Sequence, residues 1–176
     1  MHFKLPNKYY FIKTLDTNLI KKQDKNTGII YRDYTVKSYN KKLILKFNEL
    51  CKKKNIKFFI ANNIKLAKQL NLSGAYIPSF NKSMSHLCYN FQVNFTILGS
   101  AHNIKEMRIK EKQKVNTIFI SSIFKKNRNF LGLNKFKLLS NLTRNRVVAL
   151  GGVSIKNIKK LKLTKSIMFA GISFFE

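Results

Sequence analysis

The residues with the most distinctive chemistry are two adjacent glycines, Gly151 and Gly152, which directly follow the apolar block Val147–Leu150. Glycine lets the backbone approach a ligand closely, and N–H groups beside a helix start favour an anion. Gly171 interrupts a second bulky segment further along the chain. We therefore expect a phosphate site here, the alternative being an ordinary tight turn. Its predicted members are Gly151, Gly152, Val153, Gly171 and Ile172.

Three cations follow predicted strands and could hold a phosphate. Arg32 comes directly after the apolar run Gly28–Tyr31, where an arginine serves either as a bidentate phosphate clamp or as a surface ion-pair partner. Lys126 and Arg128 lie in the segment after Phe124 and could close over a second phosphate, or simply be solvated. We favour the clamp for Arg32, because the chain has only 7 acidic residues to pair with its 35 cations.

His102 is the histidine predicted at a strand end, just before the helix-capping residue Asn103. A histidine side chain gains or loses a proton near neutral pH, so it can act as a general acid or base. The alternative is a histidine that faces solvent or caps the helix. His2 and His86 receive no role.

Paired-carboxylate catalysis is not expected, because no two of the seven acids fall on neighbouring predicted strand ends. For the same reason we expect no Mg²⁺ site built entirely from protein carboxylates. The two cysteines, Cys51 and Cys88, form no C-x-x-C pair, which argues against a zinc site. Cys51 lies in an apolar helical pattern and is interpreted as a core residue.

These side chains must be positioned by short apolar segments that alternate with lysine-rich amphipathic ones. Several of the apolar segments are nearly continuous, as expected for parallel strands buried on both faces. The predicted strands are Lys8–Lys13, Gly28–Arg32, Ile56–Ala61, Gly74–Pro78, Asn94–Leu98, Thr117–Ser121, Arg146–Leu150 and Ser166–Ile172.

In the segments between the predicted strands, apolar residues recur at the spacing of a helix. The predicted buried faces carry Leu43, Phe47, Leu50 and Cys51; Leu66, Ala67 and Leu70; Ile104, Met107 and Ile109; Leu133, Phe136, Leu139 and Leu142; and Ile155, Ile158 and Leu161. Asn103 with Glu106 resembles a capping box, and Ser154 is placed to cap the helix after the glycine pair. The first and fourth helices must be minimal.

Eight alternating units in 176 residues predict an α/β fold. We expect a compact (βα)8 barrel of the TIM type rather than an open doubly wound sheet, with residues 1–176 as one domain. Because the sequence ends at Phe174–Glu176, just after the last strand, we expect no eighth helix. Functional groups in such a barrel come from the loops after the strands.

The formal net charge of +28 is compatible with nucleic acid or another anionic partner. However, the lysines are spread along the whole chain, and the excess of lysine, asparagine and isoleucine resembles a compositional bias. No stacking motif for nucleic acid is visible. We therefore expect phosphorylated small molecules as partners, no membrane association, and a cytoplasmic location, because no apolar run reaches the roughly 20 residues of a span.

An ordered set of motifs resembles the thiamine-phosphate synthase/TenI family. Phe59–Ala67 with Leu72–Pro78 is similar to its "IND-x-x-x-LA … GADGVHL" stretch, and Ser100–Asn103 to its "S-x-H-(S/N)" step. The remaining similarities are Ile118–Phe124 with "YIGFGPIF", Leu131–Leu133 with "LGL", Val148–Val153 with "VAIGGI", and Ala170–Ser173 with the last strand. The order and spacing of these motifs agree with the family pattern from about residue 28 onward.

The resemblance implies a (βα)8 barrel with one of two activities. Synthases of the family join a pyrimidine pyrophosphate to a thiazole phosphate with Mg²⁺, and tautomerases isomerise a thiazole carboxylate phosphate. The thiazole phosphate would lie near Gly152 and Gly171, and Ser100 matches a serine at the reacting centre. The implied pyrophosphate set is Arg32, Asn62, Lys126 and Arg128.

The chain departs from the family pattern where the metal would bind. Two metal-binding aspartates of the family are replaced by Asn62 and Asn81. Arg32 matches the arginine of the family's pyrophosphate-binding "QLR-x-K" motif, but the glutamine and lysine of that motif are replaced by Ile30 and Tyr34. Asparagine lacks the charge that binds a hard dication. We therefore predict a synthase with Arg32 and Ser100 essential. The alternatives are a metal-free tautomerase using His102 and a non-catalytic barrel that binds thiazole phosphate or nucleic acid.

Overall fold

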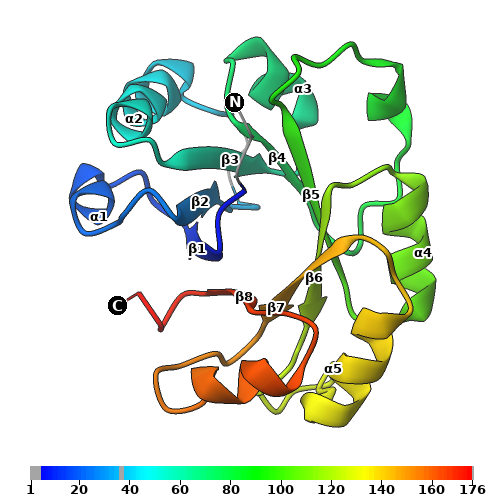
Figure 1. Ribbon diagram of the computed structural model, residues 1–176. Coiled ribbons are helices and arrows are strands. Elements are labelled where there is room, and N and C mark those ends of the chain that lie inside the picture. Colours follow the sequence, from blue (N-terminus) through cyan, green and yellow to red (C-terminus); the bar gives the residue numbers. More distant parts are fainter. Residues whose placement is uncertain (1–4, 36–37, 176) are drawn as a thin grey trace.

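Eight parallel strands close into a barrel in chain order. A computed structural model describes residues 5–35 and 38–175. Every strand pairs in parallel with the next, and β1 also pairs with β8 (Figure 1). The strands are β1 (Lys8–Ile12), β2 (Thr27–Tyr31), β3 (Lys57–Ala61), β4 (Gly74–Ile77), β5 (Thr96–Ala101), β6 (Thr117–Ser121), β7 (Arg146–Leu150) and β8 (Met168–Gly171). The predicted (βα)8 barrel is confirmed.

Helices cover the outside of the barrel between successive strands. The α-helices are α1 (Thr17–Lys21), α2 (Lys41–Lys53), α3 (Ile64–Gln69), α4 (Ile104–Lys112) and α5 (Gly132–Asn141), and two 3-10 helices complete the set, η1 (Ser85–Cys88) and η2 (Ile158–Leu163). The first and fourth helical segments in chain order, α1 and η1, are short, as predicted. No helix follows β8 within the described residues, and none of the described helices combines the length and apolarity needed to cross a membrane.

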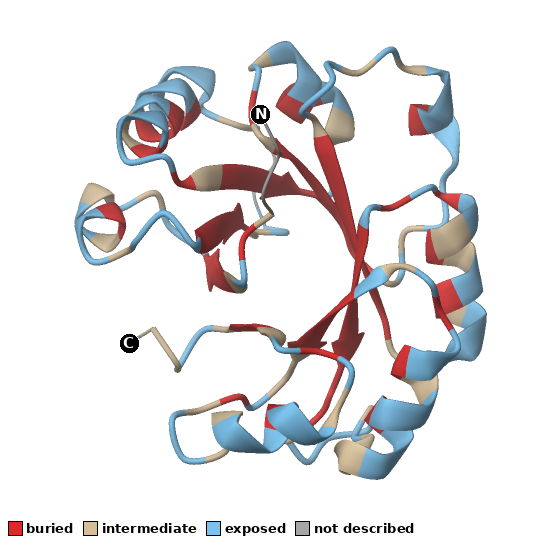
Figure 2. Cartoon of the chain, in the orientation of Figure 1, coloured by how far each residue is buried: buried red, intermediate tan, exposed pale blue. Residues whose placement is uncertain are grey.

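The barrel interior is filled by apolar side chains contributed by every strand. Alternate residues of a strand point to opposite faces, so one face of each strand fills the interior and the other packs under the helices. The interior residues are Tyr9, Phe11, Ile30, Phe59, Ala61, Tyr76, Leu98, Phe119, Val148 and Ala170. The strands are buried almost throughout, whereas the helices are exposed on their outer faces (Figure 2).

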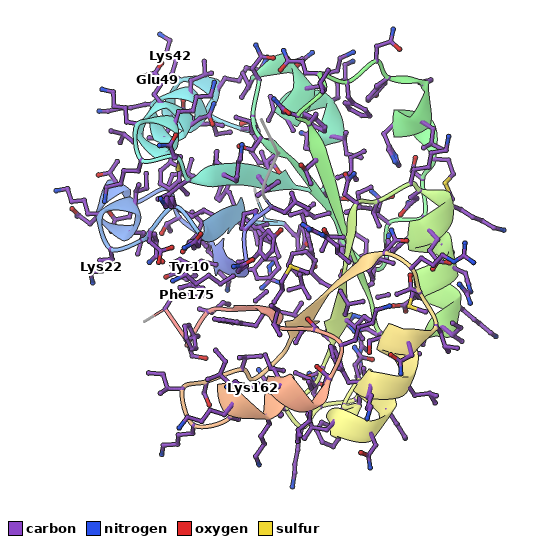
Figure 3. All side chains as sticks on the ribbon, viewed as in Figure 1. Tyr10, Lys22, Lys42, Glu49, Lys162 and Phe175 are labelled. Atoms are coloured by element: carbon purple, nitrogen blue, oxygen red, sulfur yellow. The ribbon has the colours of Figure 1, made fainter. Side chains whose placement is uncertain are left out.

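Aromatic side chains close the seam between β1 and β8. Phe175 stacks on Tyr10 of β1, with ring centroids 4.7 Å apart, and also lies against Phe169 of β8 (Figure 3). Phe174 packs edge-on against Phe169. Buried aromatic surface therefore covers the seam where other strand pairs are covered by a helix.

The fifth strand lies further along the chain than predicted. Residues Thr96–Ala101 form the strand, whereas the prediction was Asn94–Leu98. Phe95 instead belongs to a turn, in which its N–H donates to the carbonyl of Gln92. The ladder with β6 continues to Ala101, so Ser100 lies inside the strand and not in the loop after it.

Four residues of the predicted helix faces and one predicted cap were wrong. The exposed face residues are Leu43, Ile104, Leu142 and Ile155, at 43%, 37%, 45% and 78%, whereas Phe47, Cys51, Met107, Phe136 and Leu161 are buried as predicted. In α2, Ile44 packs on the barrel in place of Leu43. Ser154 caps no helix: η2 begins only at Ile158, and the Ser154 N–H donates to Asn157 Oδ1. The Asn103 cap is confirmed, because Asn103 Oδ1 accepts from the Glu106 N–H at 2.9 Å.

Candidate functional site

A cleft of about 280 Å³ opens at the carboxyl ends of the strands, between the loops after β6, β7 and β8. Phe11 of β1, Arg32 after β2 and His102 after β5 complete its wall. Its lining residues are Phe11, Arg32, His102, Ser121, Ser122, Lys125, Asn127, Asn129, Leu150, Gly151, Gly152, Val153, Gly171, Ile172 and Ser173. The cleft therefore brings together all five predicted phosphate residues with Arg32 and His102, and no acidic side chain lines it.

The glycine pair after β7 is required by close packing against the loop after β6. Gly151 and Gly152 have φ values of 101° and 75°, which other residues adopt only with strain. A Cβ on Gly151 would overlap the Ser122 hydroxyl, and one on Gly152 would lie 2.6 Å from the Lys125 nitrogen. Two N–H groups, those of Phe124 and Lys125, donate to the Gly151 carbonyl. The two loops thus form one rigid wall of the cleft.

Asn157 holds the other side of the glycine loop and was missed by the sequence reasoning. Its Nδ2 donates to the Gly152 carbonyl at 2.8 Å, and its Oδ1 accepts from the Ser154 N–H at 2.9 Å. Neither the Gly152 nor the Val153 N–H donates to a protein acceptor among the described residues. A pair of backbone donors that line a cleft without acidic groups suits an oxyanion.

Gly171 contributes space to the cleft. A Cβ placed on it would have its nearest neighbours at 3.9 and 4.0 Å, so packing does not require a glycine there. The missing side chain instead leaves room beside Ile172 and Ser173, which also line the cleft.

The His102 side chain is oriented by Ser121 at the end of β6. His102 Nδ1 lies 3.0 Å from the Ser121 carbonyl oxygen and 2.9 Å from its hydroxyl. The carbonyl oxygen accepts a hydrogen bond when Nδ1 carries a proton, and in that neutral tautomer Nε2 has the lone pair; in the other tautomer the Ser121 hydroxyl donates to Nδ1. No group among the described residues bonds to Nε2. The His102 N–H donates to Glu106 Oε2 at 2.7 Å, which fixes the backbone.

Arg32 lies over an aromatic ring and not beside a carboxylate. Its guanidinium carbon is 4.5 Å from the centroid of the Phe11 ring, a cation–π arrangement. The ion pairs among the described residues, Lys8–Asp24 and Arg108–Glu111, do not include it. Of the two interpretations offered for Arg32, the surface ion pair is therefore absent from the described structure, and its N–H groups remain available to an anion in the cleft.

Five other predicted site residues lie outside this cleft. Lys126 and Arg128 are exposed and do not line it, whereas Lys125, Asn127 and Asn129 of the same loop do. Ser100 is buried within β5 and hydrogen-bonds the side chain of Tyr76 in the barrel interior. Asn62 and Asn81 lie beside a separate small cavity.

The asparagines at the positions of the family's metal ligands do not fit a divalent cation. Asn81 Nδ2 donates to Asn62 Oδ1 at 2.7 Å, and Asn81 Oδ1 accepts from the Ser83 N–H at 2.9 Å. Each amide oxygen therefore already accepts one hydrogen bond, and neither residue carries charge. Across the described residues, no three His, Cys, Asp or Glu side chains are grouped so that they could hold a metal. Hard cations prefer free, charged oxygen ligands.

A buried lysine that the sequence reasoning did not single out anchors the loop after β4. Lys110 of α4 is fully buried and donates to the carbonyls of Pro78 and Asn81 and to Gln113 Oε1, at 2.7–2.9 Å. Burial lowers the pKa of this ammonium group to about 8. His86 Nε2 lies 2.9 Å from the Gln113 carbonyl. From the sequence alone a lysine at this position is expected on the surface, so the burial of Lys110 was not predicted.

A closed parallel barrel with its cleft at the carboxyl ends of the strands defines a TIM-type (βα)8 barrel protein. Residues 11–175 match the family described as thiamine monophosphate synthase (TMP-TENI), and the chain therefore belongs to this family.

Individual relatives agree with this membership. The thiamine-phosphate synthase of Methanococcus vannielii is 29% identical over 125 residues, which are 69% of this chain and 57% of the relative. That of Methanococcus maripaludis (strain DSM 14266) is 22% identical over 120 residues, or 66% and 58%. The aligned part of the chain thus spans somewhat more than half the length of these relatives.

Solved structures share the fold over nearly the whole chain. Thiamine phosphate pyrophosphorylase from Pyrococcus furiosus superposes with a TM-score of 0.78 at 18% identity, covering 97% of this chain and 87% of the other. The corresponding protein from Bacteroides thetaiotaomicron gives 0.67 at 16% identity, with 97% and 84% covered. At these identities the likeness concerns the fold.

Proposed function

We propose that the chain binds a thiazole phosphate in the cleft after β6, β7 and β8 and isomerises it by proton transfer, as a metal-independent tautomerase of thiamine biosynthesis. Membership of the family supports the pathway. The observation that carries the reaction is the position of His102: its unpaired Nε2 belongs to the same cleft as the backbone donors of Gly152 and Val153.

The proposed reaction needs only a phosphate anchor and a proton carrier. The N–H groups of the glycine loop hold the phosphate, and Arg32 adds positive charge to the wall of the cleft. His102 Nε2 removes a proton from one atom of the thiazole carboxylate phosphate, and a proton returns to another atom of the ring system. Substrate and product are isomers, so the step balances without a cofactor or co-reactant. Ser121 stabilises the positively charged imidazole formed in between.

The synthase reaction is a second candidate, favoured by the names of the sequence relatives and by Arg32. In that reaction the basic cleft would stabilise the departing pyrophosphate. The paired asparagines count against it, because they offer only neutral amide oxygens that already accept a hydrogen bond, and no charged ligand, to the Mg²⁺ that the family's synthases use.

The deciding experiment compares both reactions with the same purified proteins. We expect wild-type protein to isomerise the thiazole carboxylate phosphate in EDTA, and His102→Ala to reduce kcat by about 10²–10⁴-fold while thiazole phosphate still binds. Formation of thiamine phosphate from pyrimidine pyrophosphate, thiazole phosphate and Mg²⁺, lost in Arg32→Ala and kept in His102→Ala, would establish the synthase instead. If thiazole phosphate binds but neither isomerisation nor thiamine phosphate formation is detected, the protein is a non-catalytic barrel.

The phosphate anchor is tested separately with two glycines of similar backbone conformation. Gly152 and Gly132 have φ values of 75° and 66°, but Gly132 does not line the cleft. We expect Gly152→Ala to abolish the rise in melting temperature that thiazole phosphate causes, and Gly132→Ala to retain it. Equal responses of the two variants would place the phosphate elsewhere.

A further inference from the structure

Lys110 of α4 ends in a buried ammonium group that contacts the loop after β4. Its Nζ donates to the carbonyls of Pro78 and Asn81 at 2.9 and 2.7 Å, and to Gln113 Oε1 at 2.8 Å. All three N–H groups of the ammonium therefore have an acceptor. Each acceptor is a neutral oxygen, although a buried charge is usually paired with an opposite charge. These three oxygens form a cage around the ammonium.

A carboxylate does not complete this cage. Glu106 lies one turn earlier in α4, and it is the acid whose charge acts on Lys110. However, its two carboxylate oxygens accept from the His102 N–H and from Asn103 Nδ2. Among the described residues no ion pair includes Lys110. The neutral oxygens of the cage therefore hold the charge.

Strand β5 makes room for this lysine at Gly99. A Cβ placed on Gly99 would lie 2.9 Å from Lys110 Cδ and 3.4 Å from its Cγ, and 2.9 Å from Val115. Gly99 is not one of the residues with positive φ, so the backbone conformation does not require glycine there. The absent side chain instead lets the stem of Lys110 pack on the strand and reach the cage.

Gln113 extends the contact to a longer part of the loop after β4. Its Nε2 donates to the carbonyls of Asn81 and Ser83 at 3.1 and 2.8 Å. Its own main-chain carbonyl lies 2.9 Å from His86 Nε2, and Gln113 itself is fully buried. Two side chains at the end of α4 therefore hold the loop at several points.

The cage has the chemistry of a site for a monovalent cation. Its oxygens lie 2.7–2.9 Å from Nζ, whereas Mg²⁺ and Ca²⁺ bind oxygen at about 2.0–2.6 Å and favour carboxylates. Carbonyl oxygens replace the hydration shell of K⁺ in the selectivity filters of channels. Lys110 supplies the same single charge from a side chain.

We propose that the cage is a monovalent-cation site in which the Lys110 ammonium is a covalently tethered ion, and that this ion holds the loop after β4 at the mouth of the barrel. The held loop carries Phe80, whose ring packs edge-on against Tyr34 of the loop after β2, with centroids 5.5 Å apart. The proposal goes beyond the proposed function and holds for either reaction, because no cage residue lines the cleft that contains His102.

The test removes the tethered ion and supplies a free one. Lys110→Met keeps an unbranched stem but has no charge, so the cage oxygens lose their donor. Trypsin cleavage after Lys82 in the native protein, measured by mass spectrometry, reports opening of the loop, because the Lys82–Ser83 bond lies between two held carbonyls. With the ionic strength set by tetramethylammonium chloride, we expect cleavage at least about tenfold faster than in wild type. Replacing that salt by NH₄Cl or KCl should restore slow cleavage in the variant and leave wild type unchanged.

The matched control is Lys54→Met, because Lys54 Nζ also donates to main-chain carbonyls, those of Ile20 and Lys21. We expect this variant to keep the wild-type rate of cleavage after Lys82 in every salt. The proposal would be overturned by unchanged cleavage in Lys110→Met, by equal opening in both variants, or by protection of Lys110→Met in tetramethylammonium equal to that in K⁺ or NH₄⁺.

A measurement on the wild type decides the case if Lys110→Met does not fold. Nitrogen-15 NMR of the native protein should show a slowly exchanging Lys110 ammonium signal, assigned by its loss in Lys110→Arg. An ammonium group held by three acceptors exchanges its hydrogens with water far more slowly than an exposed one. Exchange as fast as that of the exposed lysines would contradict a caged ion.

Discussion

At the scale of single residues, the tight contact between Gly151 and Ser122 has a measurable cost when it is disturbed. A Cβ on Gly151 would overlap the Ser122 side chain and approach its Cα at 2.9 Å, and φ is 101°. Gly151→Ala should therefore lower the free energy of unfolding by about 1–3 kcal/mol. Gly171→Ala, whose Cβ meets nothing closer than 3.9 Å, should change it far less in the same urea titration.

The two cysteines should differ sharply in reactivity. Cys51 is fully buried, and burial raises the pKa of its thiol to about 12, whereas Cys88 is exposed. Since the thiolate is the reactive form, iodoacetamide should alkylate Cys88 in the native protein and Cys51 only after unfolding. Mass spectrometry after partial labelling measures both rates. Equal native rates would contradict the core position of Cys51.

The predicted site residues that line the cleft are those placed at the ends of strands. Gly151, Gly171, Arg32 and His102 each follow an apolar segment, and the barrel brings strand ends together. Lys126 and Arg128 were misplaced relative to the cleft because the direction of a side chain in a loop depends on its turns, which periodicity does not report. There the backbone turns Lys125, Asn127 and Asn129 toward the cleft instead.

At the scale of elements, strands were predictable and helix faces less so. A strand buried on both faces is a block of apolar residues, and Thr117–Ser121 and Arg146–Leu150 were found with their bounds. The helix faces were shifted because lysine stems can be buried and leucines exposed. In α4, Lys110 is fully buried while Ile104 is 37% exposed. The pattern of apolar residues does not indicate that a lysine is buried when its ammonium group is hydrogen-bonded.

Lys110 links α4 to the loop after β4, and its contribution to the free energy of unfolding should depend on pH. The pKa of Lys110 is lowered by burial from 10.5 to about 8. Between these values the unfolded chain binds more protons than the folded one, so this group's contribution to the unfolding free energy rises with pH, by roughly 3 kcal/mol in all. Urea titrations from pH 8 to 10.5 measure the slope.

The control for this prediction is Lys110→Arg, because arginine keeps its charge throughout that range. Tyrosines and the exposed lysines titrate in both proteins and cancel in the comparison. If the slopes of the wild type and of the arginine variant were identical, the buried ammonium would not be the source of the pH dependence.

At the scale of the whole molecule, positive charge is distributed over the surface and not gathered in one place. Lys22 directly follows α1, whereas Lys42 lies in α2 and Lys162 in η2, and all three are exposed (Figure 3). A net charge of +28 repels itself in the compact state. Raising NaCl from about 0.05 to about 0.5 M, which shortens the screening length, should therefore raise the melting temperature. A fall would show that local ion pairs outweigh the general repulsion.

The closure of the barrel through β1 and β8 also constrains how the protein is made. Tyr9 and Tyr10 in β1 pair with Ala170 and Gly171 in β8, and Phe175 packs on Tyr10. A ribosome adds residues one after another, so β1 lacks this neighbour until β8 has been translated. Contacts so distant in sequence form slowly. During synthesis the nascent chain must therefore carry an apolar strand with one unpaired edge, a natural target for chaperones.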